Sequence, residues 1–65
     1  MKTVTFQEYH GFMLNNPHLK EHITEGKEIC TYQWVDSDNV VQAQAIYQKF
    51  QPVGLVSKTY QIRES

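Results

Sequence analysis

The sequence has little of what stabilises or identifies many small proteins. It holds one cysteine, Cys30, so an internal disulfide cannot form. It has no apolar run of the roughly 18 residues that a membrane-spanning helix needs, and no charged and apolar leader segment. We therefore expect a reducing, cytoplasmic location and no membrane partner.

Basic residues and glycines are also scarce, and their scarcity argues against two classes of function, nucleic-acid binding and phosphate binding. Six basic residues stand against seven acidic ones, so the chain lacks the excess of positive charge typical of nucleic-acid-binding proteins. Its three glycines form no phosphate-binding loop. A chain of 65 residues buries only about 60% of its unfolded surface, so we expect a single domain, residues 1–65, with a small core.

The residue pattern of the first third of the chain predicts a helical segment. Residues 2–6 have the β-branched character of a strand, while Thr5 and Glu8 have the spacing of a capping box. A strand can end where a helix is capped, and the sequence leaves open whether residues 2–6 are strand or helix. Apolar residues then recur at helical spacing until "NNP" at residues 15–17. A second helical stretch after this break should end at Gly26.

The second half of the chain predicts a β-α-β unit. Residues 28–35 and 55–63 alternate in the manner of strands, with "PVG" at residues 52–54 as a turn before the second. Residues 39–51, "NVVQAQAIYQKFQ", fit an amphipathic helix that the short polar side chains of residues 36–39 would cap. The predicted fold class is α+β: a helical N-terminal segment followed by a β-α-β unit, with a small two- or three-stranded sheet and one helix packed on it.

The outer face of this predicted helix carries little charge, which is a feature of interface cores. Tryptophan and arginine are the residue types that most often dominate the binding energy of interfaces. The residues predicted to bind a partner are Val41, Gln44, Ala45, Gln48 and Lys49, with Arg63 as a charged anchor and Trp34 as an aromatic anchor.

Residue patterns for catalysis or metal binding are thin. His18 and His22 lie four apart on the expected helix, a spacing that can direct two imidazoles at one metal, but Leu19 stands where an HExxH motif has glutamate. Cys30 alternates with Trp34 on one side of a strand, as a buried thiol would. We predict no enzymatic activity, no cofactor and no metal site, and leave zinc binding by the two histidines open.

Residues 28–63 resemble the small T7-type phage inhibitors of host RNA polymerase. The resemblance rests on an acidic residue before the helix (Asp36 or Asp38), an alanine within it (Ala43 or Ala45), Phe50, Pro52-Val53-Gly54 and a final strand that ends in Arg63. It implies a compact α/β fold that blocks a host machine, RNA polymerase or a defence complex, by protein–protein contact without enzymatic activity.

We thus expect a small protein-binding inhibitor or adaptor. One alternative is a single-stranded nucleic-acid-binding module, in which bases would stack on Tyr32, Trp34 and Tyr60. Another is a structural homodimer, in which two copies would pair through Val41 and Ala45 of the predicted helix.

Overall fold

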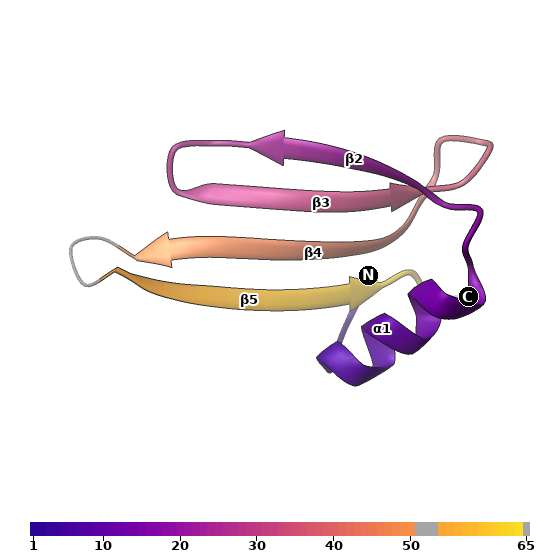
Figure 1. Ribbon diagram of the computed structural model, residues 1–65, viewed down its shortest axis with the longest axis horizontal. Coiled ribbons are helices and arrows are strands. Elements are labelled where there is room, and N and C mark those ends of the chain that lie inside the picture. The colour runs from indigo at the N-terminus through magenta and orange to yellow at the C-terminus, as the bar shows by residue number, and fades with distance from the viewer. Residues whose placement is uncertain (51–53, 65) are drawn as a thin grey trace.

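A five-stranded antiparallel sheet forms the body of the protein (Figure 1). The computed structural model describes residues 1–50 and 54–64. The strands lie in the order β1-β5-β4-β3-β2, so β2 to β5 form a meander and β1 pairs beside β5 at the far edge. The elements are β1 (Lys2–Val4), α1 (Phe6–Asn15), β2 (Lys20–Glu25), β3 (Ile29–Val35), β4 (Val41–Phe50) and β5 (Leu55–Ile62).

The start of the chain combines a strand and a capped helix; the sequence predicted the capped helix and left the strand open. β1 places Thr3 opposite Gln61 of β5. The Glu8 backbone N–H donates to Thr5 Oγ1 at 3.2 Å, and the Thr5 N–H donates to Glu8 Oε1 at 3.4 Å, which completes the capping box. The helix then ends at Asn15, where the sequence predicted a break.

The second helical stretch predicted after this break is wrong. Residues 20–25 form strand β2, which pairs with β3 from Lys20 opposite Val35 to Glu25 opposite Cys30. The Gly26 N–H donates to the Ile29 carbonyl oxygen at 2.7 Å and closes the β2–β3 turn. A glycine that signals the end of a helix also suits a tight turn, so this residue type fits both structures.

The predicted β-α-β unit is also wrong, because residues 41–50 are the central strand β4 and not a helix. β4 pairs antiparallel with β3 on one side and with β5 on the other, so the sheet has five strands and no parallel crossover. Alanine and glutamine favour helices in isolation, but pairing with two neighbouring strands outweighs a preference of a few tenths of a kcal/mol per residue.

The acidic turn before β4 explains why a helix cap was expected there. Asp36 Oδ1 accepts hydrogen bonds from the backbone N–H groups of Asp38 and Val40 at 2.9 and 3.0 Å. Its Oδ2 accepts from Gln42 Nε2 at 2.7 Å. Asn39 adopts a left-handed conformation with φ of 61°, which reverses the chain into β4. A side-chain oxygen that serves a helix cap serves this strand-to-strand turn equally well.

The core lies where α1 covers one end of the sheet. Tyr9 of α1 packs over Ala43 and Ala45 of β4, which are 0% and 2% exposed. Ala45 lies between Tyr32 of β3 and Tyr60 of β5. Small residues on the central strand therefore give the larger side chains above them room to approach the sheet. Both chain ends lie at this end of the sheet, and the β2–β3 turn lies at the other (Figure 1).

Candidate functional site

The side of the sheet opposite α1 carries no charged side chain on its three inner strands. Because residues directly opposite each other on paired strands share a face, the register arranges these side chains in rows. We call the following residues the free face: the rows Gln33–Gln44–Gln61, Thr31–Ile46–Thr59 and Ile29–Gln48–Ser57, and the pair Phe50–Leu55.

The first row is joined by side-chain hydrogen bonds across four strands. Gln33 Nε2 donates to Gln44 Oε1 at 3.4 Å, and Gln44 Nε2 donates to Gln61 Oε1. Gln61 Nε2 continues the row by donating to Thr3 Oγ1 of β1 at 3.4 Å. An amide group has two N–H donors and two acceptor lone pairs, so Gln44 retains one of each for a binding partner. The row is thus ordered and still able to form hydrogen bonds outward.

The opposite end of the free face is apolar. Ile29, Phe50 and Leu55 are 46%, 45% and 66% exposed and lie at the end of the sheet away from α1. Ile46, at the middle of the face, is half-buried. The face therefore grades from amides to aliphatic and aromatic side chains along the strands. Neither amides nor hydroxyls donate or accept protons readily near neutral pH, so this surface is suited to recognition.

The two edges of the sheet differ in how open they are to pairing with another strand. The β2 edge carries Lys20, Glu21 and Glu25, and charges on an edge strand discourage strand addition. At the other edge β1 is only three residues long and pairs with the end of β5, so within the described part of the chain residues 55–59 of β5 have no strand beside them on that side. The free face is still the broader surface through which another molecule could bind, because it spans three strands.

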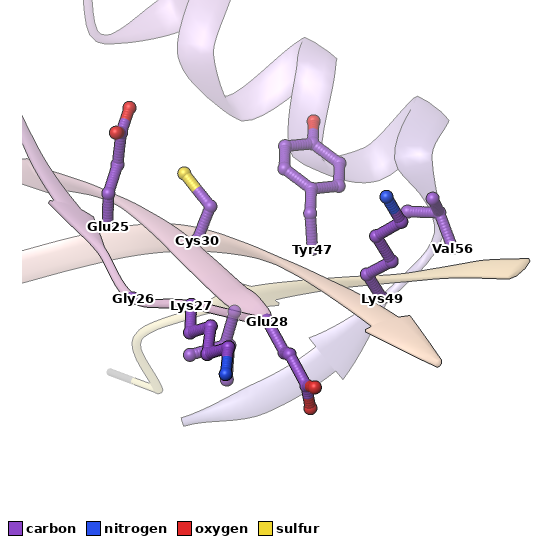
Figure 2. A pocket seen from close by; sticks show the side chains of 9 residues that line it. Glu25, Gly26, Lys27, Glu28, Cys30, Tyr47, Lys49 and Val56 are labelled. Atoms are coloured by element: carbon purple, nitrogen blue, oxygen red, sulfur yellow. The ribbon is translucent and has the colours of Figure 1, made fainter. Parts of the chain in front are cut away.

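The α1 side of the sheet has a small hollow beyond the helix. This hollow has a volume of about 290 Å³ and is lined by residues of the β2–β3 turn together with Cys30, Tyr47, Lys49 and Val56. Cys30, Tyr47 and Lys49 rise from the same side of the sheet (Figure 2). Its volume is at the lower end of the range for small-molecule sites, which begins at about 300 Å³.

Tyrosines on the α1 side are engaged with their neighbours. A hydrogen bond with Cys30 raises the pKa of the Tyr32 hydroxyl above its usual value. Burial, together with a hydrogen bond to Tyr60, raises the pKa of Tyr47 to about 12. Burial also raises the pKa of Tyr9, whose hydroxyl accepts a hydrogen bond from Trp34 Nε1 at 2.6 Å. These hydroxyls stay protonated near neutral pH and contribute to packing.

The seven residues predicted to bind a partner do not form one surface. Gln44 and Gln48 lie on the free face, whereas Ala45 and Lys49 point to the α1 side, because alternate residues of a strand face opposite ways. Ala45 is 2% exposed, so it is part of the core and cannot contact a partner. Val41 lies opposite Val35, beside an irregularity in the β3–β4 register.

The two predicted anchors lie at the end of the sheet near α1. Trp34 is half-buried and donates its indole N–H to Tyr9, so it packs inside the protein. Arg63 is exposed and follows β5, with its backbone N–H bonded to the Gln42 carbonyl oxygen at 2.9 Å. Its charge is close enough to contribute to lowering the pKa of Asp36. Arg63 is therefore at the border of the free face rather than within it.

The aromatic residues proposed to stack bases pack against one another. Tyr32 meets Tyr47 edge-on with ring centroids 5.4 Å apart, and Tyr60 lies 5.0 Å from Tyr9. With Trp34, these residues surround the core beneath α1. The nucleic-acid alternative remains an untested prediction, but these rings are not displayed side by side on an open sheet as it requires.

The histidine pair does not have the helical spacing on which zinc binding depended. His22 lies in β2, while His18 precedes that strand, so the four-residue separation no longer puts both imidazoles on one helix face. Across residues 1–50 and 54–64, no group of three or more His, Cys, Asp or Glu side chains could hold a metal ion.

Sequence reasoning missed most of the free face. Residues 28–35 and 55–63 were predicted as strands, yet apart from Arg63, at the border of the free face, none of their side chains on this side was assigned a role. The signal that could have found the face is "QAQAIYQ" at residues 42–48, which alternates with period two at all three glutamines. Reading this segment as a strand would have put Gln44 and Gln48 on one face, whereas the pairing of Gln44 with Gln33 and Gln61 comes from the register of the sheet.

A scan against protein-family models and searches of curated proteins and solved structures found nothing similar to this chain. The resemblance to phage inhibitors of RNA polymerase assumed a helix at residues 39–51, where the structure has β4. Of its Pro52-Val53-Gly54 signal, Pro52 and Val53 lie outside the described residues. A host-polymerase target stays a prediction. In the part of the chain that the structure describes, no helix combines the length and the hydropathy needed to cross a bilayer.

Proposed function

We propose that this chain is a small non-enzymatic protein-binding module, an inhibitor or an adaptor, that docks through the free face. The observation that carries the proposal is the lack of charge on this face across β3, β4 and β5. Interface cores are depleted in charged residues because an ion loses its hydration when it is covered. The lysines of β4 and β5, Lys49 and Lys58, point to the α1 side, and Lys20 shares the side of the free face only at the β2 edge of the sheet.

Domain architecture supports the same proposal. Stable domains usually pack two layers around one core, and here α1 covers only part of one side of the sheet. In the part of the chain that the structure describes, the buried hydrophobic residues are few: Tyr9, Leu19, Val35, Ala43 and Ala45. A protein surface docked on the free face would supply the missing layer. With a lone cysteine, we place this function in the reducing cytoplasm.

The test compares two glutamate substitutions on opposite faces of adjacent strands. Ile46→Glu puts a carboxylate at the centre of the free face, while Val56→Glu puts one on the α1 side, where Val56 is 54% exposed and faces Lys49. Each tagged variant is passed over candidate protein complexes at high salt, after circular dichroism has shown that it folds. The retained protein is then titrated against each variant.

We expect wild type and Val56→Glu to bind the same protein with similar affinity and Ile46→Glu to bind at least about 100-fold more weakly, because a buried, unpaired charge costs several kcal/mol. Equal binding by folded Ile46→Glu would overturn the proposed function. Retention of nucleic acid alone, lost as salt rises, would favour the nucleic-acid alternative.

A further inference from the structure

We infer that the protein surface that fits the free face is the free face of a second copy, packed face to face as a β-sandwich. The inference rests on the proposed function and names its partner. Three properties of the free face support it: its size, its lack of charge and the pattern of its rows.

The size of the sheet matches what a specific dimer needs. The molecule extends 38 × 21 Å along its two longest axes. This outline includes α1, β1 and β2, so one side of the molecule could cover at most roughly 800 Å² per copy, the size of a standard specific interface, and the free face is the central part of that area. A flat sheet face is also the natural complement of another, since two sheets pack about 10 Å apart with their side chains interdigitated.

The absence of charge makes the free face compatible with itself. A surface with a net charge would repel an identical copy, and like charges brought together across an interface cost several kcal/mol. The free face has none on β3, β4 or β5. An amide group is self-complementary as well, because Gln44 of each copy has a donor and an acceptor left after bonding within its row.

The order of the rows defines one arrangement of the two copies. A two-fold axis that lies between the sheets and runs along β4 places each row over the same row of the other copy. The glutamine row then meets the glutamine row, and Ile46 meets Ile46. At the far end, the exposed Phe50 and Leu55 of both copies cover each other. Polar groups thus meet polar groups and apolar groups meet apolar ones.

This arrangement gives the protein a core that one copy lacks. Among residues 1–50 and 54–64 of a single copy, no large side chain is fully buried. The face-to-face dimer covers Ile29, Ile46, Phe50 and Leu55, all outside the cluster beneath α1. It leaves the hollow near Cys30 and the α1 side open on both outer surfaces.

The experiment measures mass in solution by sedimentation equilibrium over a range of protein concentrations. We expect wild type and Val56→Glu to approach twice the chain mass of 7.6 kDa. Ile46→Glu and Ile46→Lys should each sediment as monomers, with dimer dissociation constants raised at least about 100-fold by the like charges at the axis. An equimolar mixture of the two should recover a dimer, because glutamate then meets lysine.

The possible outcomes separate this inference from the proposed function. A wild-type monomer at every concentration overturns the dimer, yet leaves the proposed function intact if Ile46→Glu still loses a different protein partner. A mixture that stays monomeric, while wild type is a dimer, overturns the axis along β4. Folded Ile46→Glu that remains a dimer overturns the use of the free face altogether. If either Ile46 variant fails to fold, Gln48→Glu and Gln48→Lys take their place, because Gln48 is exposed and also lies on β4, where it meets its own copy across the axis.

Discussion

Replacing Ala45 with lysine should unfold the protein, whereas the same change at the adjacent Gln44 should leave it folded. Ala45 is 2% exposed and lies between Tyr32 and Tyr60, beneath Tyr9 of α1. A longer side chain there must displace these rings, at about 1–3 kcal/mol. The lysine ammonium group must also lose hydration without an acidic partner, which costs several kcal/mol more.

These costs compare with a small total stability. At about 0.05–0.15 kcal/mol per residue, a chain of this length has a free energy of unfolding of roughly 3–10 kcal/mol. Ala45→Lys should therefore remove most of it. Gln44→Lys loses only side-chain hydrogen bonds on the open face, so its cost should stay within about 1 kcal/mol. Ala45→Val, an uncharged enlargement, should cost about 1–3 kcal/mol and lower Tm by about 4–8 °C per kcal/mol.

The assay is urea unfolding followed by fluorescence of Trp34, the single tryptophan, which is half-buried beside Tyr9. Measurement at the lowest practical protein concentration keeps self-association from adding to the apparent stability. In the amphipathic helix expected from the sequence, Ala45 and Gln44 would both be exposed, and both lysines would be tolerated. A folded Ala45→Lys with near wild-type stability would refute the position of β4 and the core built on it.

The remaining predictions concern hydrogen bonds and titrating groups. Tyr9→Phe should lower the free energy of unfolding by about 1–3 kcal/mol, because it removes the acceptor of the Trp34 indole N–H. A double-mutant cycle with Trp34→Phe should return a coupling energy of about 1 kcal/mol, and a coupling energy of zero would contradict this hydrogen bond. Backbone hydrogen bonding from Val40, together with the Gln42 amide, the Asp38 N–H and the Arg63 charge, lowers the pKa of Asp36. The resulting stability is present above the pKa of the unfolded carboxyl group, about 3.9, and is lost as pH falls through the lower pKa of the folded protein. The difference in Tm between wild type and Asp36→Asn should therefore shrink below about pH 4. At the alkaline end, the pKa of Tyr47 in the folded protein is raised to about 12. Its contribution to the free energy of unfolding is therefore full below the pKa of the unfolded tyrosine and disappears as pH rises through about 12. Ultraviolet difference spectra of wild type should show one tyrosine that ionises about two pH units late, and this tyrosine should be absent from the spectra of Tyr47→Phe.

Local signals in the sequence determined several elements of the fold. Thr5 and Glu8 specify the start of α1 through a capping box that forms between neighbouring residues, whereas the sequence left open whether the residues before it form a strand. Residues 29–35 and 55–62 have the β-branched and aromatic alternation that strands require, and both are strands. Gly26 was predicted to end a helix and Asp36 to cap one; both helices are wrong, but each residue does mark the boundary of an element, because each lies in a turn between two strands.

Only the tertiary structure decided whether a helix or a strand formed after each of these signals. The segment at residues 41–50 has helical spacing on one reading and strand alternation on another, and the choice depends on β3 and β5, which lie on either side of it. Residues 20–25 became β2 for the same reason, through pairing with β3. The notion of a surface poor in charge came from the sequence, and Gln44 and Gln48 do belong to one. Its true extent depends on cross-strand register, which brings Gln33, Gln44 and Gln61 together although they are far apart along the chain. Pairing between distant segments is a property of the whole sheet, and no short window of sequence contains it.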